Sequence, residues 1–107
     1  MKDFITYDIE SELTRSNIYN KAISLFPEFE WRKGDNDSQG KYISGRNEKK
    51  VEIQLWLGES PFEMSVCFTG VWENDPNRNN KKEQLIEIIE TRLIPIIGNK
   101  LNKNEFI

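Results

Sequence analysis

Apolar and polar residues alternate along several stretches of the chain, and this period of two is typical of half-buried β-strands. The clearest alternation covers residues 51–57 and 62–68, where every second side chain is apolar. Residues 58–61 between them have the length and composition of a hairpin turn, so we expect two adjacent antiparallel strands. Shorter alternating stretches predict further strands at residues 4–9, 29–32 and 41–46.

Two segments change to the spacing of three and four residues that is typical of an amphipathic helix. The first covers residues 14–26 and ends before Pro27, because proline disfavours helical geometry in the residue that precedes it. The second begins near Asn80, which is followed by Glu83 in the spacing of a capping box. Its apolar stripe is Leu85, Ile88, Ile89, Leu93, Ile96 and Ile97, and Pro95 is expected to kink or end the helix.

This order of elements predicts a two-layer α+β fold. Two amphipathic helices would cover one face of an antiparallel sheet of three to five strands and leave the other face partly exposed to water. A chain of 107 residues is long enough for one domain, residues 1–107. Because residues 98–107 are mostly polar, we expect them to form a flexible tail.

The composition excludes several kinds of active site. The chain contains no histidine and a single cysteine, Cys67, which removes Ser-His and Cys-His nucleophiles, internal disulfides and the commonest zinc ligands. Asp35, Asp37 and Gly40 match the first half of an EF-hand calcium loop, but Arg46 stands where that loop needs a bidentate glutamate. We therefore expect neither an enzyme nor a bound metal or cofactor.

The charge pattern also argues against two classes of partner. The net charge is −3, and the lysines occur as isolated doublets, as at Lys49 and Lys50, rather than as the basic stripe of a nucleic-acid binder. An acidic amino terminus and the lack of a long apolar stretch predict no signal peptide and no membrane span. We expect a cytoplasmic protein that binds neither nucleic acid nor membrane.

Candidate binding residues come from the polar positions of the predicted hairpin and from acidic loops. Trp56 shares its strand face with acids and amides, a composition typical of a recognition patch, although it could instead only cover the second sheet face. Asp35 and Asp37 are either turn formers or acidic contacts on a loop near Trp31 and Tyr42. The full set of candidates is Asp35, Asp37, Tyr42, Glu52, Gln54, Trp56, Glu63, Glu73 and Asp75.

The last helix adds a further acidic feature. Glu83, Glu87 and Glu90 are expected to line one helix face opposite the apolar stripe. Such a face is either an ordinary solvated surface or part of a negative surface that attracts a basic partner.

The whole profile resembles that of small bacterial toxin-immunity proteins. The chain is short, acidic and without obvious catalytic groups, and its many Ile, Asn and Lys residues with one alanine are typical of an A/T-rich gene. The resemblance implies a protein that is monomeric by itself and covers the active site of a basic toxin domain, such as a nuclease. The alternatives are a homodimeric chaperone or adaptor that associates through its sheet or last helix, and a small enzyme that uses Asp and Glu.

Overall fold

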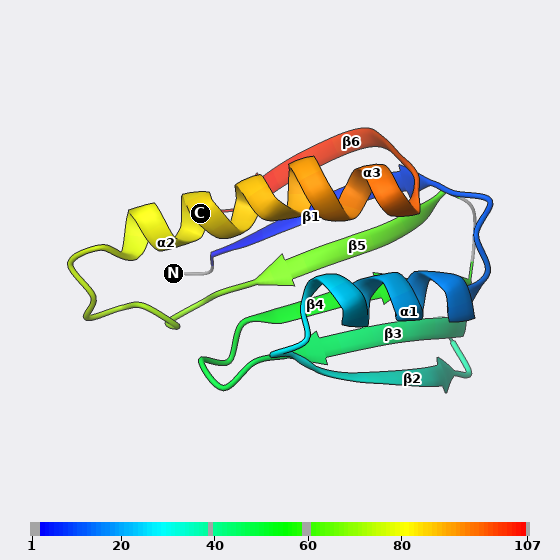
Figure 1. Ribbon diagram of the computed structural model, residues 1–107, viewed down its shortest axis with the longest axis horizontal. Helices are drawn as coiled ribbons and strands as arrows, with labels where there is room; N and C mark the ends of the chain where they lie inside the picture. Colours follow the sequence, from blue (N-terminus) through cyan, green and yellow to red (C-terminus); the bar gives the residue numbers. More distant parts are fainter. Residues whose placement is uncertain (1–2, 39, 59–60, 107) are drawn as a thin grey trace.

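Both helical segments pack on the same face of one antiparallel sheet (Figure 1). The structure is a computed structural model and describes residues 3–38, 40–58 and 61–106. The elements are, in chain order, β1 (Phe4–Glu10), α1 (Arg15–Leu25), β2 (Glu30–Asn36), β3 (Gly40–Arg46), β4 (Glu52–Trp56), β5 (Phe62–Cys67), α2 (Arg78–Ile88), a π-helical turn (Ile89–Leu93), α3 (Ile94–Ile97) and β6 (Asn99–Phe106). The predicted two-layer α+β class is confirmed.

The sheet has six strands in the order β2-β3-β4-β5-β1-β6. The predicted hairpin is confirmed, because β4 and β5 pair antiparallel with Ile53 opposite Val66. Its turn, residues 58–61, includes two positions, 59 and 60, that lie outside the described residues. Strand β1 confirms the predicted strand at 4–9, and β2 extends to Asn36, four residues beyond its prediction.

The strand count and the tail are the two errors of the predicted fold. Six strands replace the expected three to five, and residues 99–106, expected within a flexible tail, form the edge strand β6 beside β1. The register between these two strands shifts between Asp8 and Ile9. Five lysines or asparagines and only two apolar residues in this strand leave no alternation to detect, and lysines are frequent on edge strands because they discourage further pairing.

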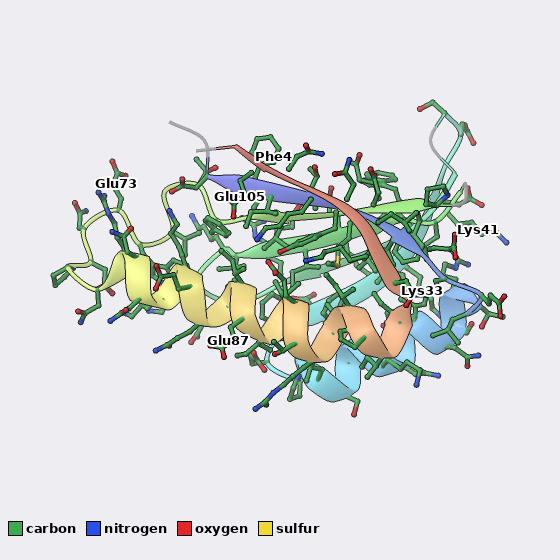
Figure 2. All side chains as sticks on the ribbon, turned by 90° about the horizontal axis from the view of Figure 1, so that it is seen from above. Phe4, Lys33, Lys41, Glu73, Glu87 and Glu105 are labelled. Carbon is green, nitrogen blue, oxygen red and sulfur yellow. The ribbon has the colours of Figure 1, made fainter. Side chains whose placement is uncertain are left out.

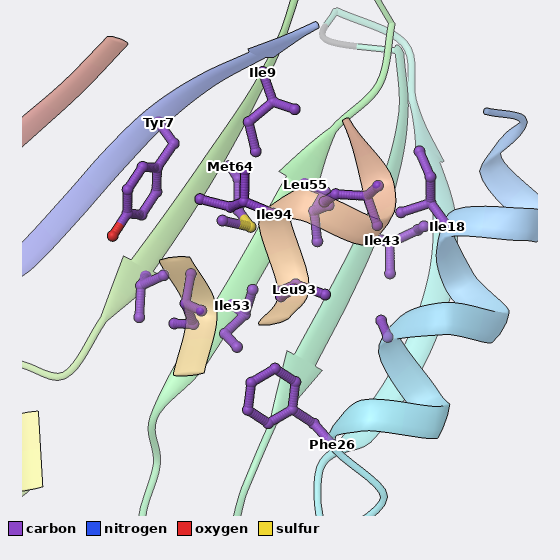
Figure 3. Close-up of a cluster of buried hydrophobic side chains, with 14 of the residues drawn as sticks. Tyr7, Ile9, Ile18, Phe26, Ile43, Ile53, Leu55, Met64, Leu93 and Ile94 are labelled. Atoms are coloured by element: carbon purple, nitrogen blue, oxygen red, sulfur yellow. The ribbon is translucent and has the colours of Figure 1, made fainter. Parts of the chain in front are cut away.

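One apolar core lies between the helices and the sheet (Figure 3). The helix side of the sheet supplies alternate residues of four neighbouring strands, and fully burying a side chain of this size contributes about 1.5–3 kcal/mol. Helix α1 adds Ile18 and Ala22, while the carboxy-terminal helical segment adds Leu93 and Ile94. The residues from the sheet include Ile5, Tyr7, Ile9, Ile43, Ile53, Leu55, Phe62, Met64 and Val66.

The two helices begin differently from each other. Helix α1 begins after Thr14, whose hydroxyl accepts a hydrogen bond from the Asn17 amide at 3.2 Å, as expected of an N-cap. Helix α2 begins at Arg78, and Asn80 lies inside it, so the predicted capping box is wrong. Asp75 instead orders the approach to this helix, because its carboxylate accepts a hydrogen bond from the Asn77 amide at 2.7 Å.

A π-helical turn interrupts the last helix and shifts the phase of every residue after it. Ile94 is therefore buried at 3% exposure, whereas Ile96, expected in the apolar stripe, is 43% exposed. The helix does not end at Ile94 but continues to Ile97, with Pro95 in the first turn of α3. Pro95 has no N–H to donate to the preceding turn, and it lies directly after the π-helical turn, where the regular hydrogen-bond pattern is already interrupted.

Candidate functional site

The sheet face opposite the helices carries no second layer in the described part of the chain. Figure 2 shows both helices on one side of the sheet and only side chains on the other, where Phe4 is labelled. The strand registers place alternate residues of each strand on this side, which we call the open face. Its members include Phe4, Thr6, Asp8, Arg32, Tyr42, Ser44, Arg46, Glu52, Gln54, Trp56, Glu63, Ser65 and Cys67.

One row across the open face combines aromatic and acidic side chains. The registers pair Gly34 with Tyr42, Tyr42 with Trp56, Trp56 with Glu63, and Glu63 with Asp8. These residues come from five neighbouring strands, and directly opposite side chains of an antiparallel pair lie close enough to interact. We call Tyr42, Trp56, Glu63 and Asp8 the aromatic-acidic row.

Packing from one end of this row positions Trp56. The Tyr42 ring lies so close over Gly34 that a Cβ atom on the glycine would be 2.2 Å from the ring carbon that bears the hydroxyl. Tyr42 in turn contacts Trp56, with 5.1 Å between ring centroids and an interplanar angle of 45°. Arg15 of α1 supports the glycine from the helix layer, donating a hydrogen bond to the Gly34 carbonyl at 2.9 Å. The tryptophan is therefore a half-buried, braced side chain rather than a free one.

The two acids of the row border a hollow. An open depression of about 610 Å³ is lined by Trp56, Glu63 and Asp8, together with residues of the two nearest turns, namely Ser38, Gly40, Gly58 and Pro61. In Figure 2 the tip of the β2–β3 hairpin bends toward this side of the sheet. Among the described residues that line the depression, Asp8 and Glu63 are the ionisable ones, and both are acids.

The middle of the open face is acidic over three strands. Among the described open-face positions of β4, β5 and β1, Glu52, Glu63, Asp8 and Glu10 are acidic and none is lysine or arginine. Glu52 accepts a hydrogen bond at 2.6 Å from the Gln54 amide, which orients both side chains. The arginines of this face, Arg32 and Arg46, belong to β2 and β3. Glu63, Asp8 and Glu10 therefore form a negative strip over β5 and β1 beside Trp56, whereas Glu52 lies at the other end of β4, opposite Arg46.

The structure brings together five of the predicted site residues and separates the other four. Tyr42, Glu52, Gln54, Trp56 and Glu63 share the open face. Those that lie apart from it are Asp35, Asp37, Glu73 and Asp75.

The predicted acidic contacts near Trp31 and Tyr42 do not form one patch. Asp35 lies opposite Lys41 near the end of the β2–β3 pair, and its position in the alternation places it on the helix side. Asp37 is exposed in the turn that follows. Trp31 is buried on the helix side, where its indole donates to the Phe26 carbonyl at 3.0 Å, while Tyr42 lies on the open face. The two rings are therefore on opposite sides of the sheet.

Glu73 and Asp75 lie in the loop between β5 and α2, at the opposite end of the molecule from the β2–β3 hairpin (Figures 1 and 2). The carboxylate of Asp75 is bonded to the Lys81 ammonium and also accepts from the Asn77 amide. These bonds, with that of Lys81 first, lower the pKa of Asp75. Asp75 is thus engaged in holding its own loop.

Glu90 also departs from the sequence prediction, because it faces the sheet rather than lining one exposed face with Glu83 and Glu87. It accepts hydrogen bonds from the Tyr7 hydroxyl at 2.9 Å and from Lys103 at 2.6 Å, and Lys100 lies 3.5 Å away. Burial acts to raise the pKa of Glu90, but the bonds from Lys103 and Tyr7 and the two lysine charges outweigh it and lower the pKa.

The pKa values of the two residues that donate hydrogen bonds to Glu90, Tyr7 and Lys103, are raised. The pKa of Tyr7 is raised far above its ordinary value, first by burial and then by the bond to Glu90 and the charges of Glu90 and Glu105. Burial acts to lower the pKa of Lys103, but hydrogen bonds to Glu90 and Glu105 and their charges raise it overall. This cluster joins the π-helical turn to β1 and β6.

Sequence reasoning omitted Asp8 from the site. The alternation in residues 4–9 places Asp8 on the polar side of its strand, which is the one local signal for it. Its neighbour Glu63 is 55 positions away in the chain, and their pairing depends on β1 lying beside β5. No local sequence pattern could predict that β1 pairs with β5 in this register.

Comparisons with known proteins add no family assignment. No protein-family model matches the sequence, and no curated protein matches it significantly. Within residues 3–38, 40–58 and 61–106, no three His, Cys, Asp or Glu side chains are grouped in a way that could hold a metal ion. The helices described there are all too short or too polar to cross a membrane.

Proposed function

We propose that this protein is an inhibitor of the immunity type, which binds a basic toxin domain through its open face and blocks the active site of that domain. The observation that carries the proposal is the negative strip of Glu63, Asp8 and Glu10 over β5 and β1 beside the ring of Trp56, which packs against Tyr42. A partner with a basic active-site surface would complement this strip, which speeds association and rejects partners of the wrong charge.

The size and composition of the face support such a role. A specific interface takes about 800 Å² from each partner, roughly an eighth of the 6888 Å² surface of this domain. Interface anchors are enriched in Trp, Tyr and Arg, and Trp56 and Tyr42 lie side by side on this face, near one end of β4 and β3. Binding by occupancy needs no catalytic group, which agrees with a chain that contains no histidine.

Growth rescue tests the proposal. The carboxy-terminal domain encoded by the reading frame next to the gene for this protein is expressed in a bacterial host. It is expressed once alone and once together with this protein. We expect the domain to stop growth and this protein to restore it. The variant W56A should weaken binding by about 2 kcal/mol or more and lose rescue at low expression.

Matched charge variants separate the open face from the rest of the surface. E63Q removes one acid from the aromatic-acidic row, and E87Q removes one exposed acid from α2. Rescue should be weaker with E63Q and unchanged with E87Q. A neighbouring frame that is harmless, or toxicity that this protein does not relieve, would contradict the proposal. A stable dimer in light scattering would favour the chaperone or adaptor instead.

A further inference from the structure

We infer that the depression beside Trp56 holds the guanidinium group of one arginine from the basic partner. This inference rests on the proposed function, since it specifies how the open face recognises positive charge. It follows from the shape of the depression, the charges that line it and the aromatic surface beside it.

The depression offers a receptor for one long cationic side chain. Its volume of about 610 Å³ lies within the usual range for ligand sites, roughly 300–1,000 Å³. Two of the lining residues, Gly40 and Gly58, contribute no side chain to it, and their backbones approach so closely that a Cβ on Gly40 would lie 3.0 Å from the Gly58 Cα. Among the described lining residues, these glycines thus offer backbone alone, and the acidic groups come from strands β1 and β5.

Asp8 and Glu63 lie side by side without a cationic partner among the described residues. Directly opposite like charges on neighbouring strands are destabilising, yet these two acids face each other and no ion pair is found for either within the described residues. Four other acids do have lysine partners, namely Asp3 with Lys82, Asp75 with Lys81, and Glu90 and Glu105 with Lys103. A cation from outside the chain would satisfy both at once.

The neighbouring tryptophan favours a planar cation. An arginine stacks on an aromatic face and donates several hydrogen bonds in a fixed plane, whereas lysine offers a point charge. Trp56 is half-buried and held by Tyr42, so its ring needs little ordering when a guanidinium binds. Glu63 lies opposite Trp56 in the strand pair, which places a carboxylate beside the ring.

The probe for this inference is N-acetyl-arginine amide, with N-acetyl-citrulline amide as the uncharged analogue of similar shape, both at constant ionic strength. The chain has three tryptophans, so three indole N–H signals report binding in two-dimensional NMR. Trp31 is an internal reference, because its indole is bonded to the Phe26 carbonyl in the core. Contacts at an exposed site are weak, so we expect saturation at roughly tens of millimolar arginine probe.

The expected result is a saturable shift of the Trp56 signal with the arginine probe and little shift with the citrulline probe. E63Q and D8N should each lower the affinity for the arginine probe severalfold, while the matched variant E87Q should leave that affinity unchanged. Preserved dispersion of the remaining signals shows that each variant is folded. Equal shifts with both probes, or equal affinity in E63Q and E87Q, would overturn the inference.

The two experiments fail independently of each other. Growth rescue without arginine binding would retain the inhibitor function and refute the guanidinium site. Arginine binding without rescue would retain the site and refute the function proposed for it.

Discussion

The Glu90 cluster gives the sharpest test of how this domain holds its edge strand. Replacing Glu90 by Gln keeps an oxygen that can accept from the Tyr7 hydroxyl but removes the charge that attracts Lys103 and Lys100. The Glu90 side chain is 23% exposed and that of Lys103 is 28% exposed, so their pair is sheltered more than a surface salt bridge. Exposed pairs contribute about 0–1 kcal/mol and hydrogen bonds to charged groups about 1.5–3 kcal/mol. We expect a loss of about 1–2 kcal/mol at pH 7.

Urea unfolding at two pH values checks both the size and the origin of this loss. A loss of this size lowers the urea midpoint by about 0.5–1 M in a small domain. Because the pKa of Glu90 is lowered on folding, its contribution is complete above the ordinary glutamate pKa, near 4.3, and disappears as the pH falls through the lowered value. The difference between wild type and E90Q should therefore narrow at about pH 3.

The neighbouring variant E87Q is the control for E90Q, because Glu87 is exposed on the same helix and its side chain makes no ion pair within the described residues. It should unfold like the wild type at both pH values. A difference between E90Q and wild type that is the same at pH 7 and pH 3 would refute the assignment to the carboxylate charge.

Three further predictions concern the acids of the open face and two glycines that lie against aromatic rings, Gly34 against Tyr42 on the open face and Gly45 against Trp31 on the helix side. D8N should stabilise the free protein by about 0.2–1 kcal/mol in thermal melting, and high salt should reduce the gain, because it removes repulsion from Glu63; a lower melting temperature would contradict this. G45A should cost about 1–3 kcal/mol in urea unfolding, since its Cβ would lie 2.5 Å from the buried, hydrogen-bonded Trp31 ring. G34A should cost less, because the Tyr42 ring that it meets is half-buried and yields more easily than the buried Trp31 ring; equal costs would show that Tyr42 is as fixed as Trp31.

Local sequence patterns correctly predicted the elements that have an uninterrupted apolar period and start or stop residues close by in the sequence. The β4–β5 hairpin alternates without interruption, and α1 has both a capping threonine and a terminating proline, so neither needs distant information. Strand β6 is different, because its residues carry almost no apolar alternation and its strand geometry comes from pairing with β1. The lysines that suggest a solvated tail are the same residues that reach Glu90 from the strand.

The last helix shows how one local irregularity misleads a periodic argument. A regular α-helix would bury Ile96 and direct Glu90 toward solvent, as the sequence analysis expected. The π-helical turn at Ile89–Leu93 holds an extra residue, so Ile94 replaces Ile96 in the core and Glu90 reaches Tyr7. Such a turn has no pattern of its own in the sequence, although Pro95 marks a place where regular hydrogen bonding already fails.

The candidate site divides in the same way between local and long-range information. Trp56 and Glu63 belong to one hairpin, and alternation alone placed them on a common polar face. Asp8 joins them only through the β1–β5 register, and that pairing adds a second acid directly opposite Glu63. With Glu63 alone, the face would carry one exposed acid beside an aromatic ring. With Asp8 opposite, it carries two adjacent like charges that weaken the free fold. A basic partner would relieve their repulsion on binding, so the same pair that lowers stability would raise affinity for positive charge.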